Sequence, residues 1–173
     1  MSIKYFKKDL QKACSSDKFL VQVKWFVFNH TLHLVFLLRL GQSLIKLPLV
    51  GRLFAFIIEY IIRILFASDI SLQSEIDKGF VIAHGHDIVI GADVVIGENC
   101  KIFNGVTLGN KDVTQTSKGS QPVIGANVVI STGAKVLGHI IVGDNVIIGA
   151  NAVVLKSCED NSTYVGIPAE KVR

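Results

Sequence analysis

The 173-residue sequence predicts a mainly β fold, a parallel β-helix of hexapeptide repeats that follows an N-terminal α-helical segment. The first observation is an aliphatic residue, often followed by glycine, that returns every six residues from residue 70 onward. The second is a small residue four positions after many of these aliphatic ones, and the third is the absence of this period from residues 1–67. The chain therefore divides into a helical segment, residues 1–67, and a repeat domain, residues 68–173.

Three helices are predicted in the first segment, near residues 5–13, 21–45 and 49–67, with Pro48 between the second and the third. In the third helix Arg52, Glu59 and Arg63 are spaced by seven and four residues, which places them on one stripe. Glu59 and Arg63 are also four residues apart, so we expect them to pair.

These charges argue against a membrane-spanning helix, which needs about 20 mostly apolar residues. We expect the helices to pack on each other or on a partner subunit, or to lie on a membrane surface as an amphipathic pair. The N-terminus is charged and has no apolar stretch followed by a cleavage site, so we predict no signal peptide.

The composition sets only broad limits on function. Half of the residues are hydrophobic and 18% are charged, which argues against disorder. The net charge of +4 is compatible with an anionic small molecule, a membrane surface or nucleic acid, and no motif points to nucleic acid. Cys14, Cys100 and Cys158 are odd in number and form no CxxC pair, so we expect a reducing cytoplasm and neither a disulfide framework nor a thiolate zinc site.

The repeat domain is predicted to form a stack of triangular coils, each made of three hexapeptides. Small residues such as Cys100 fall at inward positions, where a small core side chain is expected. No single coil buries its own core, so the coils must stack. The aliphatic positions are Ile70, Ile76, Ile82, Ile90, Ile96, Ile102, Leu108, Ile124, Ile130, Val136, Val142, Ile148 and Val154.

Two interruptions break the period of six. The step from Ile82 to Ile90 is eight residues, and the stretch between them holds His84 and His86. Between Leu108 and Ile124 the pattern pauses, which predicts a loop at residues 110–123. A polar loop of this length within a tight solenoid is typical of function, and we expect it to cover the active site of a neighbouring subunit.

The segments "GFVIAHGHDIVIG", "IFNGVTLGN" and "VGIPAEKVR" resemble, in this order, the hexapeptide-repeat acyltransferase superfamily. More narrowly, residues 68–173 are similar to serine acetyltransferases and to the related polysaccharide O-acetyltransferases of the colanic-acid type. The resemblance implies a left-handed β-helix, a homotrimer with active sites between neighbouring prisms, and acetyl transfer from acetyl-CoA to a hydroxyl. It implies no metal; the three-histidine zinc site of γ-type carbonic anhydrases has no matching spacing here.

His84 falls where this family has its catalytic histidine, and Asp69 where it has the carboxylate that orients that histidine. They are fifteen residues apart, nearly one 18-residue coil, so the two side chains are expected to lie near each other. His84 would act as general base on the acceptor hydroxyl, with the carboxylate holding its tautomer. The chain has no GxSxG or cysteine nucleophile motif, so direct transfer is favoured over an acyl-enzyme.

Further residues are candidates for binding the two substrates. His86 is either a substrate contact or a solvated corner residue, and His139 is expected in a turn. The lysines are candidates for the CoA phosphates, although for each lysine taken alone a solvated surface charge is the favoured interpretation. The acceptor candidates are His86, Ala83, Asn104 and Gln121; those for CoA are Asn110, Thr132 and Ala150, with Lys135, Lys156, Lys171 and Arg173 for its phosphates.

Two departures from the family pattern favour a sugar hydroxyl over serine. Serine acetyltransferases carry an acidic residue where this chain has Ala83, and an Arg-His pair where it has Ser120 and Gln121. Losing both would leave an amino acid without its charge partners. We therefore expect O-acetylation of a capsular, exopolysaccharide or lipid-linked glycan, made at the cytoplasmic face of the inner membrane. Serine O-acetyltransferase remains an alternative, as does a non-enzymatic β-helix scaffold.

Overall fold

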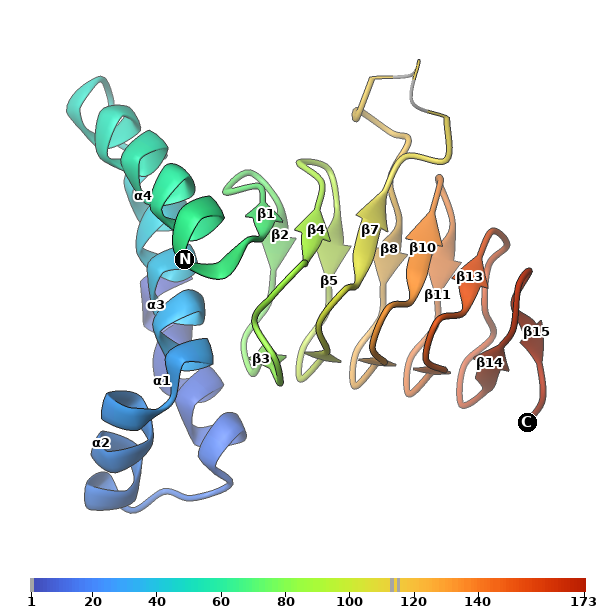
Figure 1. The fold of residues 1–173 in the computed structure, drawn as a ribbon, viewed down its shortest axis with the longest axis horizontal. Coiled ribbons are helices and arrows are strands. Elements are labelled where there is room, and N and C mark those ends of the chain that lie inside the picture. Colours follow the sequence, from blue (N-terminus) through green and yellow to red (C-terminus); the bar gives the residue numbers. More distant parts are fainter. Residues whose placement is uncertain (1, 113, 115) are drawn as a thin grey trace.

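The structure is a computed structural model that describes residues 2–112, 114 and 116–173. It consists of a left-handed β-helix and a layer of helices that covers the N-terminal end of the prism (Figure 1). The prism continues away from the helices to the C-terminus. The two parts share one hydrophobic core, which runs from α3 and α4 through every coil.

Four helices form the covering layer: α1 (Ser2–Cys14), α2 (Phe19–Phe28), α3 (His30–Leu44) and α4 (Val50–Phe66). The prediction of one helix over residues 21–45 is wrong, because that stretch breaks at Asn29. Asn29 has an extended backbone, and its Oδ1 accepts a hydrogen bond of 3.0 Å from the amide of Thr31. An asparagine in this role caps the start of a new helix, so α3 begins there instead of continuing α2.

The strands of the prism form three parallel sheets, one for each side of the triangle, and successive strands pass from the first sheet to the second to the third. The first sheet holds β1 (Asp69–Ile70), β4 (Val89–Ile90), β7 (Thr107–Gly109), β10 (Lys135–Leu137) and β13 (Val153–Val154). The second holds β2 (Glu75–Ile76), β5 (Val95–Ile96), β8 (Val123–Ile124) and β11 (Ile141–Val142). The third holds β3 (Val81–Ile82), β6 (Lys101–Ile102), β9 (Val129–Ile130), β12 (Ile147–Ile148) and β14 (Thr163–Val165), with β15 (Glu170–Lys171) antiparallel at its edge.

The strand register carries the six-residue period into the core. Ile90 pairs with Leu108, and Ile102 with Ile130, so aliphatic side chains from successive coils stack inside the prism. All the predicted aliphatic positions are buried, and Cys100 is buried at an inward position as predicted. Burying this apolar surface is the main stabilising contribution of each added coil, at roughly 25 cal/mol per Å².

Asparagines at one corner of the prism stack in the same register. Asn127, Asn145 and Asn161 all have φ between 54° and 57°, in the left-handed region that asparagine tolerates better than most residues. The side chain of Asn127 donates to that of Asn145 at 3.1 Å, and Asn145 donates to Asn161 at 2.9 Å. This ladder satisfies the polar corner groups of three successive coils.

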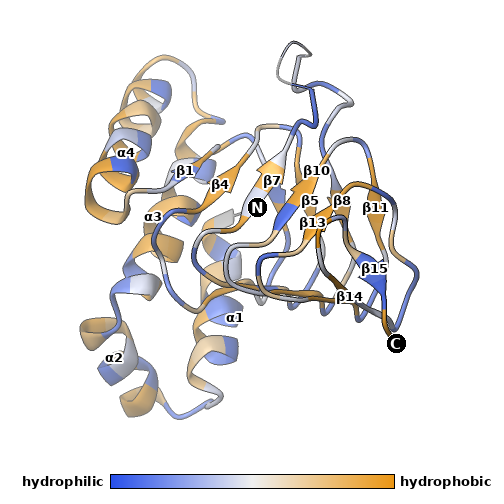
Figure 2. Cartoon of the chain, turned by 45° about the vertical axis from the view of Figure 1, so that its right-hand side comes forward, coloured by the Kyte–Doolittle hydropathy of each residue, from blue (hydrophilic) through white to orange (hydrophobic). Residues whose placement is uncertain are grey.

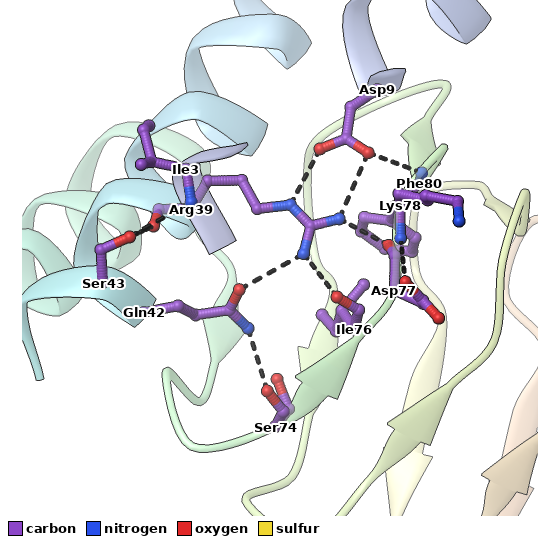
Figure 3. Close-up of polar contacts among 10 residues, drawn as sticks. All are labelled: Ile3, Asp9, Arg39, Gln42, Ser43, Ser74, Ile76, Asp77, Lys78 and Phe80. Atoms are coloured by element: carbon purple, nitrogen blue, oxygen red, sulfur yellow. Dashed lines mark hydrogen bonds and ion pairs between the residues drawn. The ribbon is translucent and has the colours of Figure 1, made fainter. Parts of the chain in front are cut away.

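A buried ion pair joins the helices to the first coil (Figure 3). Arg39 of α3 donates from Nε to Asp9 of α1 at 2.8 Å, and neither side chain has exposed surface. The same guanidinium donates to the carbonyl oxygens of Ile76 at 2.5 Å and Asp77 at 2.6 Å, while Asp9 accepts from the amide of Phe80 at 2.9 Å. One ion pair therefore binds two helices and the start of the prism at once.

Every polar atom in this joint has a partner, which a buried charge requires. Burial raises the pKa of Asp9, while the hydrogen bonds and charge of Arg39 act in the opposite direction. Gln42, one turn after Arg39, extends the joint by donating 2.9 Å to the carbonyl oxygen of Ser74.

No helix among the residues described here combines the length and the apolar character needed to cross a bilayer. The longest, α4, has 17 residues and carries Arg52, Glu59 and Arg63.

Replacing Arg39 tests the joint. Arg39→Met leaves Asp9 buried without its counter-charge, and we expect it to lower the free energy of unfolding by about 3–5 kcal/mol. Arg39→Lys keeps the charge but cannot reach every acceptor of the guanidinium, so its loss should be smaller. Denaturant-induced unfolding followed by circular dichroism measures both. A methionine variant within about 1 kcal/mol of the unmodified protein would contradict the assigned role.

Candidate active site

The corner between β3 and β4 is two residues longer than the corner one coil further on. Residues 83–88 join β3 to β4, whereas residues 103–106 join β6 to β7. The amide of Ala83 still bonds the carbonyl of Ile102 at 2.9 Å, and Asp87 and Gly105 both have positive φ at the matching position. His84 and Gly85 are therefore the extra residues, lying between two points where the coils remain in register.

Gly85 is the inner residue of this bulge, and the helices hold it. It is buried, and a Cβ added to it would lie 3.0 Å from Leu34 Cδ2, 3.5 Å from Thr31 Cγ2 and 3.8 Å from Phe66 Cδ1. A Cβ at this position would be tight against α3 and would force the end of the Leu34 side chain to shift, so the close approach favours glycine. His84, the outer residue of the bulge, is exposed, and its ring centre lies 6.1 Å from that of Phe103.

Hydrogen bonds to the linker after α4 fix the rest of the corner. The Ser68 hydroxyl donates to the carbonyl oxygen of Phe66 at 2.9 Å and accepts from the amide of Ile88 at 3.2 Å. The amide of Asp87 bonds the carbonyl oxygen of Ala67 at 3.2 Å. The position of His84 therefore depends on the helical segment as well as on the prism.

Asp69 opens β1 and pairs in register with Val89, directly after the widened corner. Its Oδ1 accepts from Arg63 Nε at 3.0 Å and from Nη2 at 2.8 Å, and both side chains are about half exposed. No hydrogen bond joins Asp69 to His84 in the described part of the chain, so the orienting role of Asp69 stays a prediction.

The predicted pairing of Glu59 with Arg63 is wrong. Arg63 turns to Asp69 instead, and Glu59 Oε1 accepts from the amide of Leu72 at 3.3 Å. Asp69 lies beyond the end of the helix, and a helical spacing rule such as i, i+4 cannot foresee that contact. The hydrogen bond and the charge of Asp69 raise the pKa of Arg63, so the guanidinium stays positive.

His86 lies at the same corner and meets a residue that the sequence did not single out as a site residue. Its Nδ1 lies 2.9 Å from the carbonyl oxygen of Gly85, and its ring centre lies 5.4 Å from that of His30, the first residue of α3. His30 in turn stacks on Phe66. No periodic signal connects residue 30 with residue 86, so only the packing of α3 on the corner reveals this pair.

Three further candidates continue from this corner in a row along the same edge of the prism. The carbonyl oxygen of His86 accepts from the amide of residue 105, that of Asn104 from residue 133, and that of Thr132 from residue 151, at 2.8–3.1 Å. Thr132 Oγ1 also donates to Asn104 Oδ1 at 3.2 Å, and Ala150 is exposed at the next corner. We call residues 84–86, 104, 132 and 150 the histidine edge.

The basic candidates differ in whether their charged groups already have a partner within the chain. Lys135 is half-buried, and its Nζ donates to the carbonyl oxygen of Gly105 at 2.6 Å and to Thr107 Oγ1 at 3.0 Å, so it braces the first sheet. Lys171 forms an exposed ion pair with Glu159 at 2.6 Å. Lys156 and Arg173 are exposed. A phosphate role for each of these residues remains a prediction.

Asn110 and Gln121 lie at the opposite edge of the first sheet, at the base of the loop between β7 and β8. Gln121 is only 6% exposed; its Oε1 accepts from the amide of Asp93 and its Nε2 donates to Asn110 Oδ1, both at 2.8 Å. The loop rises from the prism at this edge (Figure 1), and its residues 113 and 115 lie outside the described residues. We call this the loop edge. Within one chain it is separated from the histidine edge by the first sheet.

The described residues give little support for a cysteine nucleophile or a metal site. Burial raises the pKa of the Cys100 and Cys158 thiols to about 11, so neither is a ready thiolate nucleophile. No three histidine, cysteine, aspartate or glutamate side chains there lie close enough to hold a metal ion.

A cavity of about 850 Å³ lies between α3, α4 and the second sheet. Residues such as Phe56 and Leu72 line it, and none of the candidate site residues does.

Family models and known proteins agree with the repeat pattern. Residues 121–156 match the bacterial transferase hexapeptide (six repeats), and residues 87–113 match the hexapeptide repeat of succinyl-transferase. A serine acetyltransferase of Bacillus pumilus is 37% identical over 99% of this chain and 78% of its own length. One from Helicobacter pylori is 40% identical over 82% of this chain and 80% of its own.

Solved structures extend the similarity to the whole fold. The serine acetyltransferase of Brucella abortus in complex with coenzyme A superposes with a TM-score of 0.86 at 29% identity, covering 98% of this chain and 66% of that one. A serine acetyltransferase in complex with cysteine gives a TM-score of 0.87 at 29% identity, covering 98% and 69%. The chain thus spans about two thirds of these structures.

A double-mutant cycle tests the packing of the bulge on α3. We expect Gly85→Val to lower the free energy of unfolding by about 1–3 kcal/mol, because its methyl groups collide with Leu34. Leu34→Ala alone should cost about 2–5 kcal/mol through the cavity that it leaves. The double variant should lose clearly less than the sum, since the new valine fills part of that cavity. Additive losses in denaturant unfolding would show that the two residues are not in contact.

Proposed function

The chain belongs to the serine acetyltransferase family of hexapeptide-repeat transferases, and we propose that it transfers the acetyl group of acetyl-CoA to the side-chain oxygen of L-serine. The observation that carries this proposal is the similarity to the Bacillus pumilus serine acetyltransferase, 37% identical over 99% of this chain. The Brucella abortus relative in complex with coenzyme A supports acetyl-CoA as the co-substrate.

The expectation of a sugar acceptor is wrong. The Bacillus pumilus relative and the two solved structures described above are serine acetyltransferases, and their similarity covers the helices as well as the repeat domain. The expectation rested on two charged groups absent near Ala83 and Gln121. Such an absence is weak evidence, because another side chain of the fold can supply the charge. Gln121 is also held inward by Asp93 and Asn110 in this chain.

His84 acts as the general base in the proposed reaction. Its imidazole takes the proton of the serine hydroxyl as the oxygen attacks the carbonyl carbon of the thioester. The tetrahedral intermediate collapses, the C–S bond breaks, and the leaving thiolate takes the proton back from the imidazolium. The exposed position of His84 on the histidine edge supports this role, because both substrates can reach it.

Arg63 supplies a positive charge for the carboxylate of L-serine. Its Nε and Nη2 both donate to the same oxygen of Asp69, which leaves N–H groups of the guanidinium for a substrate. Both of these hydrogen bonds end on Oδ1, so Asp69 Oδ2, which accepts none from the described residues, would orient His84 once the substrates are bound. Arg63 lies six residues before Asp69 near the end of α4, where no motif of the sequence predicts a substrate contact.

Three copies complete the site by bringing the loop edge of one prism to the histidine edge of the next. This assembly is supported by the separation of Asn110 and Gln121 from His84 within one chain. CoA would lie between two prisms, beside Asn104, Thr132 and Ala150, with Lys156 near its phosphates. The free state of the three cysteines supports a reducing compartment such as the cytoplasm.

His84→Ala tests the reaction. We expect CoA release with L-serine to fall by roughly 10²–10⁴, the usual contribution of a general base. His139→Ala is the matched control, because His139 is another exposed histidine of the prism and lies outside the histidine edge. A thiol-detection assay with purified protein measures both. Turnover with glycan acceptors but none with L-serine would contradict the proposal.

Arg63→Gln tests recognition of the acceptor. Losing a charge-assisted hydrogen bond of about 1.5–3 kcal/mol should raise KM for L-serine on the order of ten- to a hundredfold. KM for acetyl-CoA should stay unchanged, and the melting temperature should shift little because the ion pair with Asp69 is half exposed. Equal increases in both KM values, or no increase, would exclude this contact.

A further inference from the structure

Helix α2 packs Phe26 against Phe6 and Phe36 but exposes most of its other apolar residues, and its one buried residue is polar. Gln22, 8% exposed, is its one buried residue, and its Nε2 donates to the carbonyl oxygen of Ser16 at 3.1 Å. Phe19, Leu20 and Phe28 are 75%, 80% and 81% exposed. A helix that only covers a core faces the other way, with its apolar residues inside. The apolar face of α2 is therefore directed at something outside this chain.

Helix α4 is apolar on its outer side as well. It buries a narrow stripe that includes Ala55, Ile58 and Ile62 against the core. The side away from this stripe remains apolar and exposed, in a broad arc beside the charged stripe of Arg52, Glu59 and Arg63. Its members are Val50, Leu53, Phe54, Phe56, Ile57, Tyr60, Ile64 and Leu65.

The prism has no comparable surface. Of 24 exposed large hydrophobic residues in the described chain, 17 lie in residues 3–65, including every aromatic one. Those of the prism are valines and isoleucines without an aromatic neighbour among them, and Val123 and Ile141 lie opposite each other on neighbouring strands. In Figure 2 the hydrophobic colour of α2 and α4 lies at the side away from the later coils, while that of the prism follows its strands. Exposed apolar patches of this extent mark interaction sites.

Charge separates the two parts in the same way. Residues 1–67 contain ten lysines and arginines against three acidic residues, a net charge of +7, whereas residues 68–173 contain eight against eleven, a net charge of −3. Asp9, one of the three acidic residues, is neutralised inside the joint by Arg39. Lys18 and Lys24, both exposed, lie immediately before α2 and within it.

We propose that the outward faces of α2 and α4 form a docking surface for an anionic lipid bilayer. Phenylalanine, tryptophan, tyrosine and leucine beside lysine are the residues that bind the boundary between head groups and acyl chains. The excess positive charge is complementary to anionic head groups. The proposal concerns peripheral contact and is independent of the acceptor.

The position of these helices favours a flat partner. They cover one end of the prism (Figure 1), so a trimer whose axis runs parallel to the prism would present three such faces at the same end. Weak contacts made by three copies on one surface add up to stable binding without any new contact. This last step depends on the proposed trimer, whereas docking of each chain does not.

Vesicle flotation tests the proposal with the full-length protein. We expect it to float with vesicles of phosphatidylcholine and phosphatidylglycerol, to bind phosphatidylcholine alone much more weakly, and to lose affinity in high salt. Lys18→Glu should weaken binding to the anionic vesicles roughly fivefold or more. Phe28→Glu, at an 81% exposed position, should abolish flotation. Ile141→Glu, an exposed apolar position of the prism, is the matched control and should float normally.

Light scattering without lipid separates the membrane from a second copy as the occupant of this face. The proposal expects the same oligomer mass for the unmodified protein and for Phe28→Glu. A smaller oligomer for Phe28→Glu would assign the face to a contact between copies and overturn the proposal. Failure of the unmodified protein to float with anionic vesicles would overturn it as well. Flotation and CoA release with L-serine are separate readouts, so either can fail alone.

Discussion

The stacking register of the coils is the constraint on which the rest of the structure depends. Strand pairs such as Ile90 with Leu108 keep successive coils aligned, so residues at the same phase form rows. The inward row becomes the core, and the corner rows become continuous lines of backbone hydrogen bonds. The histidine edge is one of these corner rows. Residues far apart in sequence, such as Asn104 and Thr132, therefore lie side by side because the register of the coils places them there.

The site arises where this register is interrupted without being lost. His84 and Gly85 are inserted between two points that remain aligned with the next coil, so the bulge stays local. Gly85 packs against Leu34 and Phe66, and the helices are tied to the first coil by Arg39 and Asp9. The helical segment therefore has two roles: it positions the corner that carries His84, and it carries most of the exposed apolar surface of the described chain.

Features that follow the six-residue period were predictable from the sequence, and contacts between the helices and the prism were not. The period of six was enough to predict the prism and the inward position of Cys100, because the aliphatic residue of each strand marks the position that is buried. The break at Asn29 was not predicted. The long apolar stretch on both sides of Asn29 favoured one continuous helix more strongly than the capping tendency of a single asparagine favoured a break. The contacts of Arg63 with Asp69, of His30 with His86 and of Arg39 with Asp9 join parts that share no period. The expectation of a sugar acceptor was wrong for another reason. Ala83 and Gln121 show which charges are absent, whereas the position of Arg63 beside Asp69 becomes visible only in the fold.

The central claim is that acetyl transfer takes place at the histidine edge. A crystal structure of the protein with CoA bound tests it most directly. The account predicts the pantetheine arm beside Asn104, Thr132 and Ala150, its sulfur next to the imidazole of His84, and the loop of a neighbouring subunit over it. CoA bound along another edge of the prism, or with its sulfur beyond reach of His84, would contradict the account.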